Sequence, residues 1–341
     1  MHHRVGVRPQ GLHVTPCNTR RSNPAGACCA FLLLLGACTD PQPAPLAANL
    51  FAFGVFGDGP YTWTDARKYA HLVEDVSNAD IEWLLHVGDV LWFPCSDEAY
   101  QNRLAVLNSI PHPVVYTPGD NEWLDCHEDR PGNYPPLDRL ESIRKIFFAQ
   151  PAQSIGGVRM PLETQSADPR FAEIVENARW QRGGYVFATM HMVGGGNGLG
   201  DYPGRSAEDD AEVETRTAAA LAWMEAAFDV ARADSSHGVV LALHANPGLE
   251  RNPAAWTGYG EFVAALERLT SGFSGQVLLI HGDTHTWRVD QPLTGPTGDP
   301  LPNFTRLETY GSPDIGWIRV VIDSVTGRFV AFEPKRFSVF R

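Results

Sequence analysis

Short apolar runs alternate with segments of helical periodicity along most of this chain, and this alternation restricts its fold more than any other feature. The β-rich apolar runs span residues 51–57, 81–88, 113–117, 184–193, 237–244 and 276–281. Segments with apolar residues at helical spacing lie near 64–78, 97–109, 137–149, 207–232 and 259–271. Strands that alternate with helices predict an α/β layered domain, which we place at residues 51–341. Its final stretch, 304–338, is predicted to form a β-meander.

The N-terminal region differs in character from this domain. Arg20 and Arg21 precede a short apolar run that ends in small residues, which is typical of a secretory signal. The sequence "LGAC" at its end resembles a bacterial lipobox, so we predict a signal peptide at 1–37 and lipid attachment at Cys38. An ordinary secretory signal with an incidental cysteine is the alternative. Residues 38–50, rich in Pro and Ala, would then form a tether, and the protein would be exported, either membrane-anchored through Cys38 or periplasmic or extracellular.

The charge of the chain argues against binding to a nucleic-acid polymer. The formal net charge is −13, and residues 1–37 contain four arginines and no acid, so the remainder carries −17. Nucleic-acid affinity depends on Lys and Arg side chains that neutralise phosphates. We therefore expect a small substrate rather than a nucleic-acid partner.

Two cysteines, Cys95 and Cys126, would remain unlipidated in the exported chain. Thiols in an oxidising compartment favour a disulfide. Two buried free cysteines are the alternative.

Acids and histidines follow five of the apolar runs. In α/β domains, ligands bind at the carboxyl ends of the strands. A single "GD" is most often only a turn, but a set at five strand ends indicates a common site. The residues at these ends are Asp58, Asp89, Asp120 with Asn121 in "TPGDNEW", His244, and Asp283 with His285.

In this order and spacing the chain resembles the calcineurin-like metallophosphoesterases, which include the purple acid phosphatases. The family motifs are D-x-H, G-D, G-N-H-[DE], a lone His and G-H-x-H, and the resemblance covers most of residues 51–325. It implies a four-layer α/β/β/α sandwich with a dinuclear metal centre that hydrolyses phosphoric esters through a metal-activated hydroxide. Transferred residue by residue, it implies one ion held by Asp58, Asp89 and His285, and a second held by Asp89, Asp120, His244 and Asp283.

The departures from these motifs change the expected chemistry. Pro60 replaces the histidine of D-x-H, and Trp92 stands where purple acid phosphatases have a ligating tyrosine. Asp120 takes the asparagine position of G-N-H-E and Asn121 the catalytic histidine, although a shift by one residue would make Asn121 the ligand. Asp283 replaces the first histidine of G-H-x-H.

These extra carboxylates shift the preference toward hard divalent ions such as Mn²⁺, Mg²⁺ or Ca²⁺, with Fe and Zn as further candidates for the two ions. Four aspartates cancel the charge of two divalent ions to about zero, where the usual two leave about +2. The pull on a dianionic monoester should therefore be weak, and a monoanionic diester should be the better substrate.

The proton donor for the departing oxygen is the open part of the mechanism. Asn121 cannot replace a histidine as an acid, but it can hydrogen-bond a phosphate oxygen. Candidate substitutes are His127, His281 and His191, each of which is more commonly a surface or packed residue. The glycine-rich stretch "VGGGNGLG", 193–200, is either a flexible loop or a substrate loop with Asn197 as a contact.

A second hypothesis belongs to a different functional class. The histidines lost at Pro60 and Asn121 would also suit a weak or inactive member of the fold that acts as a metal-dependent binding protein.

Overall fold

The computed structural model describes residues 46–250 and 257–340. The predicted signal peptide, Cys38 and most of the predicted tether lie outside these residues. Among the described residues, no helix has both the length and the apolar character needed to cross a bilayer.

One sheet has six strands in the order β13-β12-β1-β2-β3-β4. β1, β2 and β3 run parallel to one another, and β12 pairs antiparallel with the other side of β1. The bounds are β1 (Leu50–Phe56), β2 (Leu84–His86), β3 (Pro113–Tyr116), β4 (Ile155–Gly156), β12 (Gly316–Asp323) and β13 (Arg328–Arg336).

The other sheet has seven strands in the order β10-β11-β9-β8-β7-β6-β5. Here β7, β8, β9 and β11 are parallel. The bounds are β5 (Glu163–Thr164), β6 (Ala178–Arg182), β7 (Tyr185–Thr189), β8 (Gly238–Ala242), β9 (Gln276–His281), β10 (Arg288–Asp290) and β11 (Phe304–Glu308).

Aromatic residues join the two sheets face to face. Phe53 of β1 stacks on Trp83 at 5.3 Å between ring centroids, and Phe187 of β7 meets Trp83 edge-on at 5.1 Å. These rings belong to one buried cluster with aliphatic residues from both sheets. Burial of this shared face is the main force that holds the sheets together.

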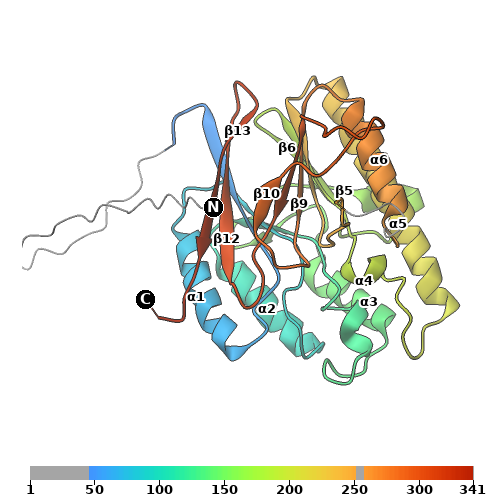
Figure 1. Cartoon of the computed structure of the whole chain (residues 1–341). Helices are drawn as coiled ribbons and strands as arrows, with labels where there is room; N and C mark the ends of the chain where they lie inside the picture. The colour runs from blue at the N-terminus through green and yellow to red at the C-terminus, as the bar shows by residue number, and fades with distance from the viewer. Residues whose placement is uncertain (1–45, 251–256, 341) are drawn as a thin grey trace, which may run out of the picture. The chain divides into compact units, whose positions relative to one another are not determined.

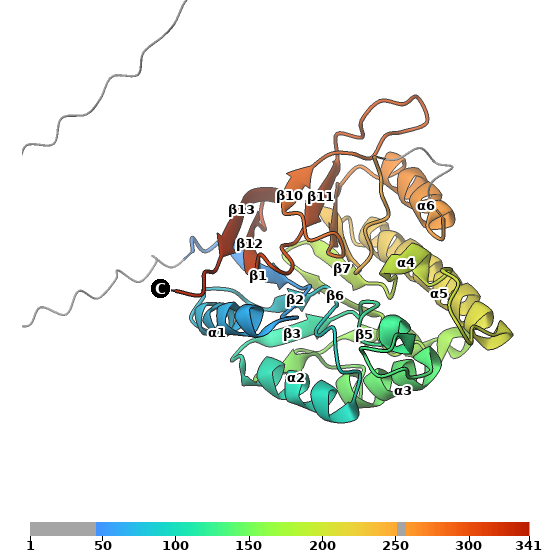
Figure 2. The same ribbon diagram turned by 60° about the horizontal axis from the view of Figure 1, so that its bottom comes forward.

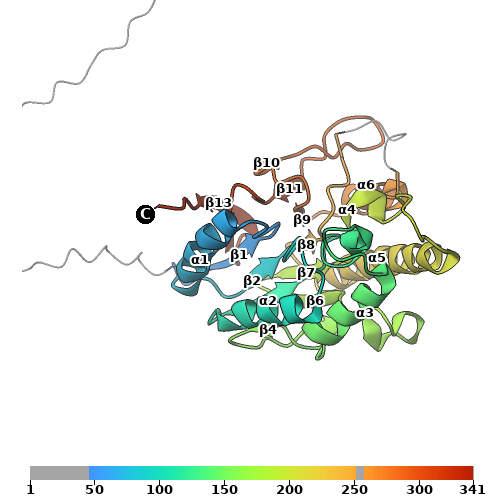
Figure 3. The same ribbon diagram turned by 90° about the horizontal axis from the view of Figure 1, so that it is seen from below.

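Helices cover the two outer faces (Figures 1 and 2). α1 (Trp63–Ser77), α2 (Asp97–Ser109) and α3 (Pro136–Phe147) share a core with the six-stranded sheet, whereas α5 (Ala207–Ala233) and α6 (Gly260–Ser271) share one with the seven-stranded sheet. In Figure 3 the strands lie between α1 and α2 on one side and α5 and α6 on the other. The predicted four-layer α/β/β/α sandwich is thus confirmed.

The local sequence explains where these helices begin. Thr62 caps α1 by accepting a hydrogen bond from the backbone N–H of Asp65, whose carboxylate accepts one in return from the Thr62 N–H. The same capping box opens α5 with Ser206 and Asp209. All five long helices fall where the periodicity predicts them.

The predicted β-meander at 304–338 is wrong in one part. β12 and β13 form the expected antiparallel hairpin, but β11 pairs in parallel with β9 in the other sheet. The chain therefore crosses from one sheet to the other between Glu308 and Gly316. Alternation of apolar residues predicts a strand, but not the sheet that it joins.

Candidate metal centre

Four carboxylates and a histidine converge at the carboxyl ends of β1, β2, β3, β8 and β9. The ligand atoms of Asp58, Asp89 and His244 lie within 4.8 Å of one another, and so do those of Asp120, His244 and Asp283. His244 Nε2 is 3.4 Å from Asp89 Oδ1 and 3.2 Å from Asp120 Oδ1. We call Asp58, Asp89, Asp120 and Asp283 the acid cluster.

Both candidate histidine ligands present the same nitrogen to this cluster. The Nδ1 atom of His244 lies 2.8 Å from the Val87 carbonyl oxygen, and that of His285 lies 2.7 Å from the Ser312 carbonyl oxygen. Because a carbonyl only accepts, Nδ1 carries the proton in each ring and donates it. The Nε2 lone pair is then free for a cation, as is usual for metal-binding histidine.

The surroundings of these two Nε2 atoms support this assignment. His244 Nε2 is buried and has no hydrogen-bond partner, which is costly for a polar atom unless a ligand occupies the space in front of it. His285 Nε2 lies 3.7 Å from Asp58 Oδ1.

Backbone strain is concentrated at the same residues. Asp58, Asp89, Asp283 and His285 have φ values of 53°, 55°, 74° and 58°. Non-glycine residues seldom adopt this left-handed region, and when they do it is often at functional sites. Tight turns at the strand ends thus aim these side chains at one point.

Hydrogen bonds fix the orientation of the carboxylates. Asp58 accepts from the backbone N–H of Asp283 at 2.9 Å and from the hydroxyl of Thr309 at 3.1 Å. Asp283 accepts from the backbone N–H of Asn246 at 2.9 Å. The crossover loop after β11 supplies both Thr309 and the Ser312 carbonyl, so it buttresses the site.

Glu122 is a positioning residue that the sequence analysis missed. Its buried Oε1 accepts hydrogen bonds from the backbone N–H groups of Asp89 at 3.2 Å and Gly119 at 2.8 Å, and from the Tyr116 hydroxyl at 2.5 Å. This one carboxylate therefore ties the loop after β2 to the loop after β3. The position of Glu122 directly after "GDN" was the one sequence feature that could have pointed to this role.

Tyr61 was missed as well. Its hydroxyl donates to Asp89 Oδ2 at 2.7 Å, one residue after the Pro60 that replaces the family histidine. Asn121 also serves Asp89, through its backbone N–H at 3.1 Å and its side-chain amide at 2.6 Å. The structure thus brings Asp120 into the group of candidate ligands, whereas Asn121 donates hydrogen bonds to the carboxylate of Asp89.

The charges within the cluster are not balanced by the protein. Burial raises the pKa of Asp58 and of Asp283, and raises that of Asp89 well above its usual range. Burial alone would lower the pKa of His244, but the charges of Asp89, Asp120 and Asp58 raise it well above the usual value. Protons thus compete for the place of a cation, and the residues fit hard divalent ions that prefer oxygen ligands.

Comparison with known proteins agrees with this architecture. No family model and no curated protein matches the sequence. Among solved structures, PhoD superposes with a TM-score of 0.52 and 12% identity, covering 86% of this chain and 70% of PhoD. GAP50, described as the anchor in the inner membrane complex of Plasmodium, gives a TM-score of 0.47 and 10% identity over 86% of this chain and 90% of its own.

The chain has the calcineurin-like metallophosphoesterase fold. The PhoD likeness shows the fold alone. In this metallophosphoesterase fold the five strand ends carry Asp58, Asp89, Asp120, His244 and Asp283 in the order expected from the sequence.

The three predicted proton donors bond elsewhere in this metallophosphoesterase fold. His127 contacts the Leu124 carbonyl at 2.8 Å and stacks on Tyr202 at 4.4 Å. His191 is buried with its Nδ1 at 2.8 Å from Glu176. His281 is fully buried, and burial lowers its pKa to about 3, so at neutral pH it holds no extra proton to donate. The structure gives these rings packing positions.

The glycine-rich loop lies against the site through its first glycine. A Cβ at Gly194, in α4 (Gly194–Asn197), would meet Asp120 Oδ2 at 2.3 Å and Asp283 Oδ1 at 3.0 Å. Asn197 itself is buried and holds the loop, because its side chain accepts from Arg216 at 2.5 Å and donates to Thr217 at 2.9 Å. A substrate contact by Asn197 would require these bonds to break.

The disulfide predicted between Cys95 and Cys126 is present, with 5.8 Å between the Cα atoms. Cys95 lies in the loop between β2 and α2, and Cys126 lies in η1 (Leu124–His127) after β3. The bond therefore links the two loops that carry Asp89 and Asp120.

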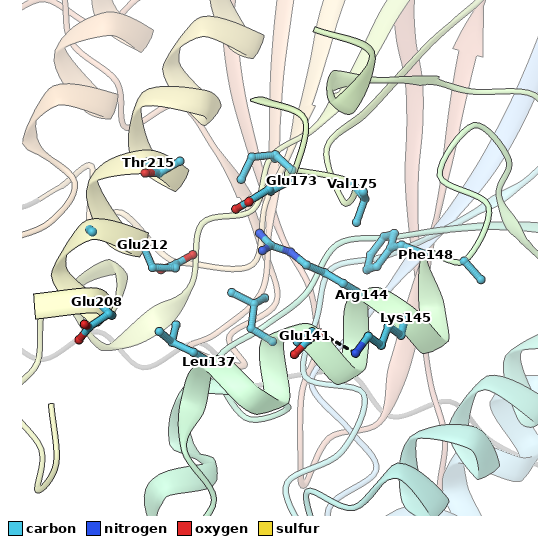
Figure 4. Close-up of a pocket in the computed structure, with 14 residues that line it drawn as sticks. Leu137, Glu141, Arg144, Lys145, Phe148, Glu173, Val175, Glu208, Glu212 and Thr215 are labelled. Carbon is cyan, nitrogen blue, oxygen red and sulfur yellow. Dashed lines mark ion pairs between the residues drawn. The ribbon is translucent and has the colours of Figure 1, made fainter. Parts of the chain in front are cut away.

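A groove of about 930 Å³ opens elsewhere, between α3, the start of α5 and residues 173–175 (Figure 4). Apolar side chains such as Leu137 and Phe148 line it together with Glu141, Arg144 and Glu212. None of its lining residues belongs to the acid cluster, so its size does not mark the chemical site.

Proposed function

We propose that this protein hydrolyses phosphoric esters with the help of divalent metal ions. The observation that carries the proposal is the convergence of the acid cluster on the unpartnered Nε2 atom of His244. Buried carboxylates without matching positive charges are unfavourable unless cations bind among them. The fold supports the same activity, since metal-dependent phosphoester hydrolysis is the chemistry that the sequence resemblance implies.

The residues divide between two ion positions that share one carboxylate. Asp58, Asp89 and His285 would hold one ion, and Asp89, Asp120, His244 and Asp283 the other. Bound ions supply Lewis-acid polarisation of the phosphate and a nucleophilic water. Mn²⁺, Mg²⁺ and Ca²⁺ suit this oxygen-rich set best.

The side chains around Asp89 orient this carboxylate and the substrate. Tyr61 and Asn121 donate to its Oδ2 atom, which fixes the direction of the shared carboxylate. We expect the Asn121 amide also to hydrogen-bond a phosphate oxygen of the substrate. Because His127, His191 and His281 bond elsewhere, we expect esters with good leaving groups, such as nitrophenol, to be cleaved best.

The charge of the centre favours diesters over monoesters. Four carboxylates neutralise two divalent ions to about zero, so a dianionic monoester gains little attraction. The test compares bis-nitrophenyl phosphate with nitrophenyl phosphate at one pH on Mn²⁺-loaded protein. Faster cleavage of the diester is expected, and faster cleavage of the monoester would contradict the charge argument. No hydrolysis of either ester by protein that elemental analysis shows to bind Mn²⁺ would favour the metal-dependent binding-protein alternative.

We also propose export with lipid attachment at Cys38. The Cys95–Cys126 disulfide supports an oxidising compartment. Cell fractionation tests the anchor, since a Cys38→Ser variant that stays with the membrane fraction would contradict it.

A further inference from the structure

An aromatic wall borders the acid cluster on the side of the loop after β2. The Tyr61 ring lies 5.8 Å from the His285 ring and 6.3 Å from the Trp92 ring, measured between centroids. Phe93 continues the wall, edge-on to Trp92 at 5.3 Å. Trp92 is thus the neighbour of Tyr61, whose hydroxyl donates to Asp89.

Arg130 lies over two of these rings, with its guanidinium group 4.5 Å from the Trp92 centroid and 4.0 Å from the Phe93 centroid. We call Trp92, Phe93 and Arg130 the Trp92 wall. Arg130 is exposed and, within residues 46–250 and 257–340, forms no ion pair, although Glu128 and Asp129 directly precede it. A guanidinium that stacks on aromatic rings keeps its N–H edges free for an anion.

The loops that form the wall are held in place by covalent and hydrogen bonds. The Cys95–Cys126 disulfide joins them, and the backbone N–H of Cys95 donates to the Pro131 carbonyl at 3.0 Å. The backbone on both sides of this contact is therefore held before any ligand arrives, which reduces the entropy cost of binding.

Other cations near the site already have partners. Arg103 donates to the Pro60 carbonyl at 3.2 Å, and Lys68 donates to the Pro313 carbonyl at 2.5 Å. An anionic substrate that meets an almost neutral metal centre needs positive charge from elsewhere. Within the described part of the chain, Arg130 lies beside these rings without an ion pair, so it can supply that charge.

We propose that Arg130 binds a second anionic group of the substrate, so that the preferred substrates are phosphodiesters bearing a further carboxylate or phosphate. This inference rests on the proposed function and names its substrate class. Bidentate hydrogen bonds from guanidinium to a carboxylate or phosphate are both strong and directional.

Three nitrophenyl diesters, with ethyl, phenyl and carboxyphenyl as the second substituent, test the proposal on Mn²⁺-loaded protein. Arg130→Gln should lower kcat/KM about tenfold for the carboxyphenyl ester, the effect of one charge-assisted hydrogen bond, and less than about twofold for the other two. Arg130→Lys should restore part of the loss. Arg170→Gln is the matched control, because Arg170 also lies over an aromatic ring, Phe171, at 5.3 Å.

Two outcomes would overturn the proposal. Equal losses for the phenyl and carboxyphenyl esters would show that the wall stacks on planar groups instead of binding an anion. Unchanged kinetics for all three esters in Arg130→Gln would show that Arg130 does not contact the substrate.

A calorimetric comparison separates this proposal from the proposed function. If wild-type protein hydrolyses none of the esters, the proposed function fails, but binding of phenylphosphonate and carboxyphenylphosphonate to the Mn²⁺-treated protein still tests Arg130. Tighter binding of the carboxylated ligand, lost in Arg130→Gln, would support the anion site, and equal binding would overturn it.

Discussion

Two buried acidic sites in this protein differ in how their charge is balanced. Glu176 is fully buried between Arg144, whose Nη2 atom lies 2.6 Å from Glu176 Oε1, and His191. Burial would raise its pKa, but Arg144 and His191 lower it to about 2. Asp89 is also buried, and burial together with the charges of Asp120, Glu122 and Asp58 raises its pKa well above the usual range, although His244 acts in the opposite direction.

The difference shows what each site is built for. The protein supplies the cation for Glu176, so that site is complete and stabilises the fold. In residues 46–250 and 257–340, the close ion pairs of the acid cluster involve imidazole rings and no Lys or Arg. Its missing charge must come from bound ions, and metal-free protein keeps the cluster at a cost in stability.

The largest expected effect comes from Asp89→Asn. Removing the carboxylate shared by both ion positions should lower metal-dependent diester hydrolysis on the order of a thousandfold, or about 4 kcal/mol in the barrier. Initial rates and bound Mn²⁺ are measured together. Asp97→Asn, at an exposed carboxylate paired with Arg139, is the control and should leave both unchanged. Full activity in Asp89→Asn would end the two-ion assignment.

Glu176→Gln should instead lower the stability of the fold. It leaves the charge of Arg144 unpaired, and removing one partner of a buried ion pair costs about 3–5 kcal/mol in the free energy of unfolding. Urea denaturation measures this loss. Metal-free Asp89→Asn should be at least as stable as the metal-free wild type, because one repelling charge is gone. Glu141→Gln at the exposed Lys145 pair should change nothing measurable. Equal losses in Asp89→Asn and Glu176→Gln would contradict the comparison.

The pH dependence of stability should separate the two sites by sign. The pKa of Glu176 is lowered to about 2 from its usual 4.5, so its contribution is present above about pH 4.5 and is lost as the pH falls through 2. The stability gap between wild type and Glu176→Gln should shrink by about 1.4 kcal/mol per pH unit within that window.

Asp89 should show the reverse trend in metal-free protein. Its raised pKa means that its contribution is present at low pH and is lost as the pH rises through the folded-state value. Urea midpoints for wild type and both variants between pH 3 and pH 7 measure the two trends. A gap for Glu176→Gln that widens toward low pH would be incompatible with the assigned pKa.

The sequence was sufficient to place the candidate ligands, because acids at successive strand ends must meet at one edge of each sheet. It did not reveal their supports. Glu122 and Tyr61 act through contacts that depend on how neighbouring loops cross, and neither contact has a characteristic spacing. The proton-donor predictions lacked support for a similar reason, since a histidine near a strand end, such as His281, can point into the core. β11 was assigned to the wrong neighbours because apolar alternation does not encode which sheet a strand joins.

The smallest effect tests how tightly the glycine-rich loop closes over the cluster. In Gly194→Ala the new methyl group would lie 2.3 Å from Asp120 Oδ2, so either the loop or the carboxylate must shift. Mn²⁺ affinity should fall about tenfold, as for other disturbances around a metal ligand, while unfolding of the metal-free protein should change less. Titration calorimetry measures the affinity, with Gly200→Ala as the control because its Cβ would meet its nearest neighbour at 3.6 Å, an ordinary contact. An unchanged affinity in Gly194→Ala would mean that Asp120 tolerates displacement, and its place among the ligands would then be the first assignment to abandon.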